Sequence, residues 1–213
     1  MTVEDVKFGL VALTAIFFVV DPFAAAPIFL AITAGDDRAK RLQTALRAAL
    51  AAFVALSFFA VLGTLVFRAF GISLGAFKIA GGLMLFLMSV DMMRAQASRT
   101  RSTAEEEGEA ALRPDVAVVP MAIPVLAGPG AIATVMVMMS RADWIPVRTA
   151  SVLGAVALTC LATWLVLRWA AVAERVFTRT TVHVLQRVMG LLLAAVAVEF
   201  VAGGLRDLFP GIV

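Results

Sequence analysis

One stretch decides the fold class of this chain: Asp21-Pro22-Phe23-Ala24-Ala25-Ala26-Pro27 lies inside an apolar run that extends over residues 6–34. A straight helix of that length would measure roughly 43 Å at about 1.5 Å per residue, against about 30 Å of bilayer hydrocarbon. Each proline removes an intrahelical hydrogen bond and pushes the preceding residue out of the helical conformation. We therefore predict a membrane-spanning helix that is broken between Asp21 and Pro27.

The composition requires a membrane around the rest of the chain as well. Of the 213 residues, 62% are hydrophobic and 15% are charged, and the mean hydropathy is +0.99. Soluble domains lie nearer about 45–50% apolar and about 25% charged. The long apolar stretches, each close to the length of one membrane span, are residues 6–34, 43–69, 71–93, 114–140, 147–170 and 183–205. The sequence predicts an all-α polytopic membrane protein of six transmembrane helices, without a soluble domain.

The same unit recurs in the second half of the chain. The fourth apolar stretch contains Pro124-Val125-Leu126-Ala127-Gly128-Pro129-Gly130, where two prolines again stand five positions apart with small residues between them. At a constant offset of 108 residues, Gly82 aligns with Gly190 and Asp91 with Glu199. We infer a duplication of a three-helix unit whose first helix, helix 1 or helix 4 of the chain, is broken.

A unit of three spans crosses the membrane an odd number of times, so its second copy must be inverted. We predict a first membrane repeat over residues 1–93, a cytoplasmic linker over 94–113, and a second repeat over 114–213. Inverted repeats are a recurrent plan of secondary transporters, with the solute site at the midplane where the repeats meet. This step is an analogy between folds.

The basic residues indicate the orientation. Of the 18 Lys and Arg residues, twelve fall on the side of the first, third and fifth loops, which predicts that this side is cytoplasmic and both termini lie outside. They are Arg38, Lys40, Arg41, Arg47, Arg94, Arg99, Arg101, Arg113, Arg168, Arg175, Arg179 and Arg187. We read these charges as orientation signals and expect no nucleic-acid binding. The first span should be retained, because its leading flank holds Glu4 and Asp5 with only Lys7.

The two breaks are candidate binding elements. Proline suits the first position of a helix, so we predict that a helix restarts at Pro27 and at Pro129. The N–H groups that follow, from Ile28 to Leu30 and from Gly130 to Ile132, would be unused donors at a positive helix end, for which a carboxylate is the natural partner. The candidate substrate-binding residues are Asp21, Pro22, Pro27, Ile28, Ala127, Gly128, Pro129, Gly130, Ala131 and Thr134. The alternative is that both prolines only shape the packing.

Acidic residues within the spans are candidate functional groups, because a carboxylate at membrane depth is costly unless it faces the bundle interior or a cavity. Asp21 could pair with a substrate ammonium, carry a coupling proton, or simply cap the restarted helix. Asp91 and Glu199 would flank opposite mouths of the pathway as gate or proton-path groups.

Other chemistries find little support. The sequence has a single cysteine, Cys160, and a single histidine, His183. We therefore expect no intrachain disulfide, no metal site, no cofactor and no enzyme activity of the zinc-protease or Ser–His type.

Several of these motifs together resemble the MarC family of membrane proteins. They are Val20-Asp21-Pro22-Phe23-Ala24-Ala25-Ala26-Pro27-Ile28-Phe29-Leu30, the run Phe70-Gly71-Ile72-Ser73 with Ala80-Gly81-Gly82, and the block from Pro120 to Ile132 that contains Gly128-Pro129-Gly130. The likeness covers essentially the whole chain. It implies a bacterial or archaeal inner-membrane protein with six spans, of a family classed with neutral amino-acid transporters. The family usually has glycine where this chain has Ala24 and often threonine where it has Ala133.

We expect a secondary transporter or exporter of small neutral amino acids such as alanine, glycine, serine or threonine, with proton coupling as an option. The alternatives are an exporter of another small metabolite or toxic compound, and a membrane assembly or stress protein that moves no solute. A homo-oligomer is compatible with either.

Overall fold

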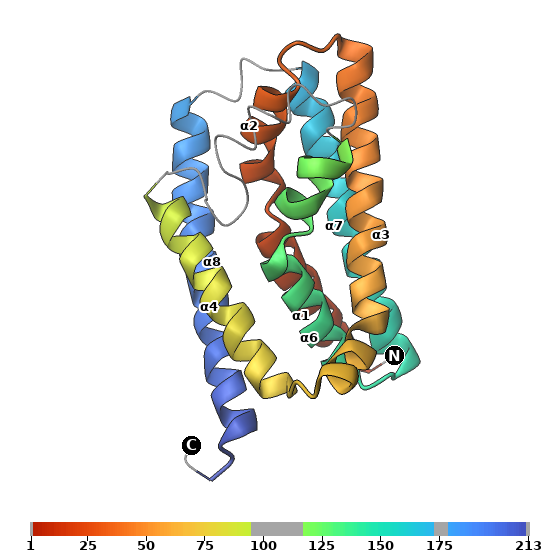
Figure 1. Cartoon of the computed structure of the whole chain (residues 1–213), viewed down its shortest axis with the longest axis vertical. Helices are drawn as coiled ribbons and strands as arrows, with labels where there is room; N and C mark the ends of the chain where they lie inside the picture. The colour runs from red at the N-terminus through yellow and green to blue at the C-terminus, as the bar shows by residue number, and fades with distance from the viewer. Residues whose placement is uncertain (1, 95–116, 173–178, 212–213) are drawn as a thin grey trace.

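The computed structural model describes residues 2–94, 117–172 and 179–211, and every regular element among them is helical. The elements in chain order are α1 (Val3–Val20), α2 (Pro22–Ile32), α3 (Arg38–Phe70), α4 (Leu74–Met93), η1 (Ala117–Leu126), α6 (Pro129–Ala142), α7 (Pro146–Val172) and α8 (Arg179–Leu208) (Figure 1). The predicted linker over residues 94–113 lies outside the described residues except for Arg94.

The helices have the lengths that a membrane requires. Five spans in the described chain are long and apolar enough to cross a bilayer, and α1 and α2 together make one of them, Val3–Ile32. The pair η1 and α6, which meet at an angle of 61°, passes the same test of length and hydropathy when the two are taken together, and it makes a sixth if the bent pair is counted as one span. The predictions of an all-helical membrane protein and of a broken fourth helix are confirmed.

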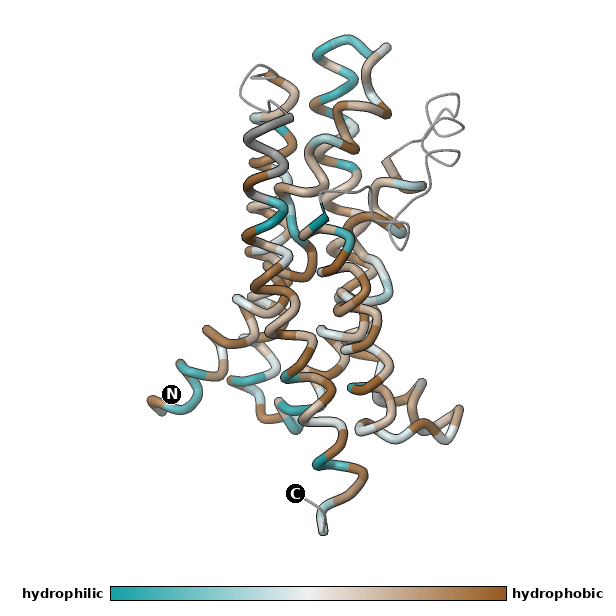
Figure 2. Tube along the Cα trace, turned by 90° about the vertical axis from the view of Figure 1, so that its left-hand side faces the viewer, coloured by the Kyte–Doolittle hydropathy of each residue, from teal (hydrophilic) through white to brown (hydrophobic). Residues whose placement is uncertain are grey.

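The broken spans occupy the middle of the bundle. In Figure 1, α4 and α8 lie together along one side, α3 lies on the opposite side with α7 packed against it, and the broken spans run between these pairs. Figure 2 shows that the hydrophilic residues gather toward the two ends of the bundle. The interrupted backbone is therefore covered by unbroken helices on both sides.

The pairing of α4 with α8 depends on small residues at close contacts. A Cβ added to Gly82 would lie 2.8 Å from the carbonyl oxygen of Ala197, and one added to Gly190 would lie 3.0 Å from the carbonyl oxygen of Ser89. The two contacts are reciprocal. Adding 108 to the residue numbers converts Gly82 to Gly190 and Ser89 to Ala197, so each glycine meets the counterpart of the residue that the other glycine meets. The flanking contacts follow the same offset: Phe200 and Val201 beside Gly82, Met92 and Met93 beside Gly190.

Candidate functional site: two interrupted helices

The first break is a single residue. Asp21 adopts the left-handed conformation (φ 49°, ψ 74°), its N–H donates to the carbonyl oxygen of Phe17 at 2.9 Å, and it thereby ends α1. Its carboxylate Oδ1 accepts from the N–H of Ala24 at 3.2 Å, so it also caps α2, whose first residue is Pro22. Asp tolerates this conformation better than most residues. Asp21 is 2% exposed and lies inside the bundle, as predicted.

The expectation that the first span restarts at Pro27 is wrong. The helix restarts at Pro22, and Pro27 lies inside α2. The N–H groups of Ile28 to Leu30 therefore belong to the helix interior and not to its positive end, where only the first turn has unpaired donors. The reason is that Asp21 supplies both the left-handed turn and the cap, after which proline at the next position suits the first turn.

The second break is longer. Val119 and Ile123 are extended, with φ near −130° and ψ of 121°, because each precedes a proline. The peptide bonds before Pro120 and Pro124 are both cis. The interruption thus begins earlier than the predicted stretch and ends at Gly128, after which α6 starts at Pro129. The prediction that a helix restarts at Pro129 is confirmed.

The N-terminus of α6 has no side chain to cap it. Its N-cap is Gly128, and the first intrahelical bond runs from the N–H of Ile132 to the carbonyl oxygen of Gly128 at 3.0 Å. Within the described residues, no group accepts from the N–H of Gly130 or of Ala131. These two donors form a positive helix end of the kind that binds carboxylates.

Counted from the helix starts, the two breaks correspond position by position. Asp21 takes the place of Gly128, Pro22 that of Pro129, and Ala24 that of Ala131. The N–H of Ala24 donates to a carboxylate oxygen in the first break, whereas the corresponding N–H of Ala131 donates to no side chain in the second.

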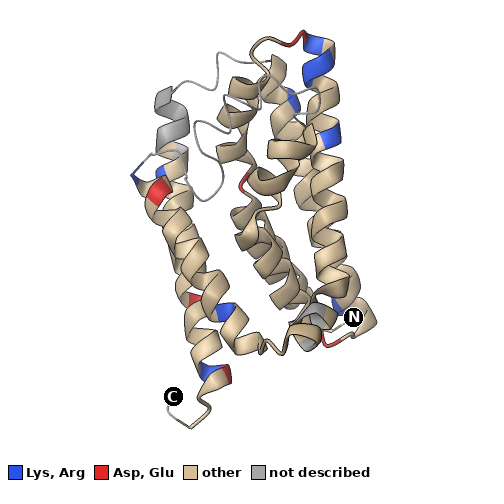
Figure 3. Cartoon of the chain, in the orientation of Figure 1, with Lys and Arg blue, Asp and Glu red and all other residues tan. Residues whose placement is uncertain are grey.

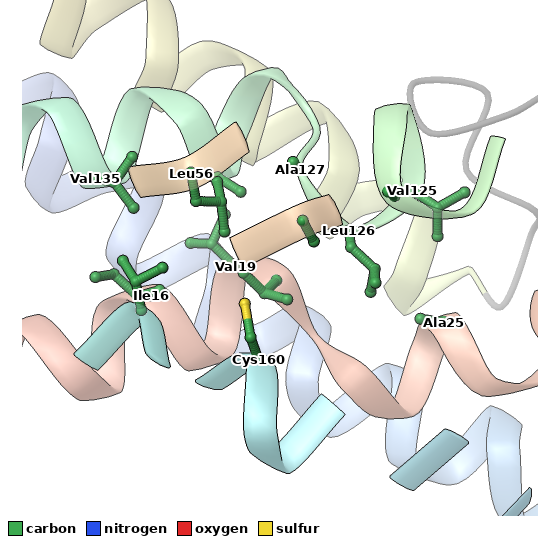
Figure 4. Packing of buried hydrophobic residues seen from close by; sticks show 14 of the residues in the cluster. Ile16, Val19, Ala25, Leu56, Val125, Leu126, Ala127, Val135 and Cys160 are labelled. Carbon is green, nitrogen blue, oxygen red and sulfur yellow. The ribbon is translucent and has the colours of Figure 1, made fainter. Parts of the chain in front are cut away.

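The two breaks lie at the same level of the bundle. α1 contacts α6 and α2 contacts η1, so the interruption of one span lies beside the interruption of the other. Figure 4 shows Val19, just before Asp21, close to Leu126 and Ala127, just before Gly128. Leu56 of α3 packs at the same place and is fully buried, as is Leu126. The surroundings of both breaks are therefore apolar.

Thr134, one of the candidate binding residues, has its hydroxyl hydrogen already engaged. Thr134 is fully buried, and its Oγ1 donates to the carbonyl oxygen of Gly130 one turn earlier at 2.8 Å. Its hydrogen is used within α6, although the oxygen keeps acceptor capacity. The opposite wall is close, because a Cβ added to Gly130 would lie 2.6 Å from Cδ2 of Leu85 on α4.

The other two predicted acids lie away from the breaks. Asp91 is partly buried near the end of α4, and Glu199 is exposed on α8 in the single chain. Sequence reasoning missed Arg141, which is in the last turn of α6 yet reaches α8: its Nη2 lies 3.6 Å from a Cβ added to Gly203, one turn beyond Glu199. No sequence signal pairs α6 with α8 at this point.

Charge is otherwise sparse within the bundle, and most charged residues lie toward its two ends (Figure 3). Lys78 of α4 is an exception at 5% exposed, and its Nζ lies 2.5 Å from Oδ2 of Asp207 on α8. Within the described part of the chain, no cluster of His, Cys, Asp and Glu could hold a metal ion.

These features define the class: a polytopic helical membrane protein in which two interrupted spans meet inside the bundle. The chain belongs to the MarC family of integral membrane proteins, whose model matches residues 6–209. The predicted resemblance is thus confirmed.

Relatives in bacteria and archaea cover nearly the same length. The chain is 34% identical to the UPF0056 membrane protein YhcE of Escherichia coli over 92% of this chain and 91% of that protein. It is 36% identical to the UPF0056 membrane protein YvbG of Bacillus subtilis over 92% and 93%, respectively. It is 38% identical to the UPF0056 membrane protein MJ1677 of Methanocaldococcus jannaschii over 95% and 98%. No solved structure matches the chain.

Proposed function

We propose that this protein is a secondary transporter of small neutral amino acids. The observation that carries the proposal is the uncapped N-terminus of α6 at Gly128, which lies at the same level as the buried acid Asp21. The proposal includes no chemical step, so the protein would not be an enzyme.

The solute carboxylate would take, at α6, the place that the Asp21 carboxylate takes at α2. It would accept from the N–H groups of Gly130 and Ala131, at the positive end of the helix. The solute ammonium would face Asp21, which could alternatively carry a coupling proton. Ala127 and the glycines on either side of Pro129 present little side-chain bulk, which suits an amino acid with a small side chain.

Two observations support an inverted repeat. An offset of 108 residues converts the contacts of Gly82 with α8 into those of Gly190 with α4, which is the relation expected across a two-fold axis. The starts of α2 and α6 also correspond, at nearly the same offset. Such an axis would lie in the membrane plane, and rocking of one repeat against the other would open the site to each side in turn.

Gate roles for Asp91 and Glu199 follow from the same symmetry. Glu199 would act with Arg141, whose guanidinium approaches α8 one turn away, at the mouth on the side of the termini. We further propose that the termini lie outside the inner membrane, on the basis of the uneven distribution of the basic residues. The bacterial and archaeal relatives fit that membrane.

Flux in proteoliposomes tests the function. Radiolabelled alanine, glycine, serine and threonine should accumulate, and a pH gradient should change the rate if Asp21 carries a proton. The proposal fails if none of the four moves, and the role of Asp21 fails if Asp21→Asn transports as well as the wild type. Movement of another small metabolite alone would identify the exporter alternative.

A second candidate is a membrane protein that moves no solute. The tight apolar packing of Val19, Leu56 and Leu126 beside the breaks favours it. Under this alternative, wild-type protein in detergent would show no thermal shift with any neutral amino acid, and replacing Gly128 would change only stability.

A further inference from the structure

A groove runs along the outside of the bundle between α3 and α7. Its deeper part is a hollow of about 220 Å³. The residues that line this part are Leu46, Ala49, Leu50, Phe53, Ala157, Cys160, Leu161 and Trp164. A second hollow of about 370 Å³ lies at the end of the two helices where α3 begins. It is lined by Arg38, Leu42, Arg168, Trp169 and Val172.

The two hollows are parts of one feature. Leu42 and Leu46 are one turn apart on α3, and Arg168 and Trp164 are one turn apart on α7. From Arg38 to Phe53 the groove extends roughly 22 Å at about 1.5 Å per residue. That length exceeds half of the about 30 Å of bilayer hydrocarbon, so the groove has the depth of one leaflet.

The chemistry of the groove changes along its length. The deep part is apolar throughout, whereas the shallow end holds the exposed side chains of Arg38 and Arg168. The Arg168 guanidinium lies 5.3 Å from the ring centre of Trp164, which positions it at the junction of the two hollows.

Neither arginine has an acidic partner among the described residues. The two acids that precede Arg38 are engaged elsewhere: Asp36 pairs with Lys40 at 2.5 Å, and Asp37 accepts from the N–H of Lys40 at 2.7 Å. The shallow end of the groove is therefore a positive site to which no acid of the described residues lends a counter-charge.

We propose that this groove binds a phospholipid with an anionic headgroup. The phosphate would lie between Arg38 and Arg168, and one acyl chain would run along the apolar wall past Leu46 and Leu161. Basic pockets between membrane helices on the cytoplasmic side are typical sites for such headgroups, and tryptophan is typical of the membrane interface. A second copy of this chain fits less well, because the described residues that line the groove include two arginines and no acid.

Tryptophan fluorescence offers a direct test, because two of the three tryptophans, Trp164 and Trp169, line the groove. In a Trp144→Phe background, the protein is reconstituted with phosphatidylglycerol or phosphatidylcholine carrying brominated acyl chains. Brominated phosphatidylglycerol should quench at a mole fraction roughly tenfold lower than brominated phosphatidylcholine, since two arginines near the headgroup each favour the anionic lipid.

The matched variants separate a specific site from general membrane contact. Arg38→Gln with Arg168→Gln should reduce the preference to less than about twofold. Arg94→Gln with Arg187→Gln removes the same charge from exposed positions at the end of α4 and on α8 and should keep the preference. Ala157→Phe, at an exposed position of the groove, should weaken quenching by both lipids through bulk alone.

Three results would overturn the proposal. They are equal quenching by both lipids in the starting protein, an unchanged preference after both groove arginines are replaced, and a dimer by light scattering that Ala157→Phe dissociates. The last result would assign the groove to a second copy of the chain.

Discussion

The first and second breaks share one element, a helix that restarts at a proline, but they complete it differently. In the first, Asp21 supplies an oxygen to the N–H of Ala24 and the new helix is capped by its own chain. In the second, Gly128 stands at the same position and offers no side chain. One helix end is therefore capped by its own chain, whereas the other still has the N–H donors of Gly130 and Ala131 for a ligand.

The difference in shape agrees with the difference in capping. α1 and α2 form one span interrupted at a single residue, whereas η1 and α6 meet at 61° after extended residues at Val119 and Ile123. The first break is thus capped by the chain itself, and the second is the one that the proposed solute would cap.

The ends of the two broken spans should lie on opposite sides of the membrane. In a Cys160→Ser background, Gly35→Cys after α2 and Trp144→Cys after α6 would each carry the only thiol. An impermeant maleimide added to intact cells should label the cysteine at 144 and not the one at 35, because the proposed inverted arrangement places the loop at 35 in the cytoplasm and the loop at 144 outside. Labelling of both or neither from one side would contradict the inversion.

A carboxylate added to the second break should compete with the solute. Gly128→Asp would place an acid where Asp21 stands in the first break, and Gly128→Ala is the matched control. Both bring a Cβ to 2.7 Å from the carbonyl oxygen of Pro124. Binding of alanine should be weaker in the Asp variant than in the Ala variant by roughly tenfold or more, the value of a charge-assisted hydrogen bond.

The variants Gly128→Asp and Gly128→Ala should also differ in their free energy of unfolding. The Asp variant should be more stable than the Ala variant by about 1 kcal/mol, because it caps α6. A thermal unfolding scan would then place it about 2–4 °C higher. Weaker alanine binding without that gain would indicate a steric effect and count against the capping argument.

Two substitutions of Asp21 in the first break should distinguish its role as a helix cap from the role of its charge. Asn caps helices as well as Asp and tolerates a positive φ, so Asp21→Asn should keep the wild-type melting temperature while it loses transport. Asp21→Ala should lose transport and also about 1 kcal/mol of stability. Thermal shift and flux on the same preparations check both. Normal flux in Asp21→Ala would leave Asp21 a structural cap only.

At the reciprocal glycines the expected effects are on stability and not on solute binding. Gly82→Ala and Gly190→Ala should each cost about 1–3 kcal/mol, because the added methyl meets backbone of the other helix. Gly154→Ala on α7, with nothing within 4 Å, is the control and should gain about 0.5–1 kcal/mol. Costs for the two glycines that differ by more than their errors would weaken the two-fold relation.

The sequence predicted the spans because hydropathy and length are properties of each segment alone. It also predicted the restart at Pro129, because Gly-Pro-Gly is unambiguous there. It misplaced the first restart, because the spacing of Pro22 and Pro27 was given more weight than Asp21-Pro22, which is itself a cap followed by a first helical residue. The rule for residues before proline could have extended the second break to Val119.

Features that depend on pairs of distant helices could not be predicted. The approach of Arg141 to α8 and the groove between Arg38 and Arg168 require knowing which helices are neighbours. Apolar spans pack without distinctive sequence signals, so a single sequence does not reveal these pairs.

The central claim is that the second break recognises a carboxylate. The most direct measurement is inhibition of labelled alanine uptake in proteoliposomes by unlabelled alanine and by alaninamide, which differs only in that its carboxylate is an amide. Alanine should inhibit at concentrations at least roughly tenfold lower, since alaninamide cannot offer a charged acceptor to the N–H groups of Gly130 and Ala131. Equal inhibition by alaninamide would contradict the account.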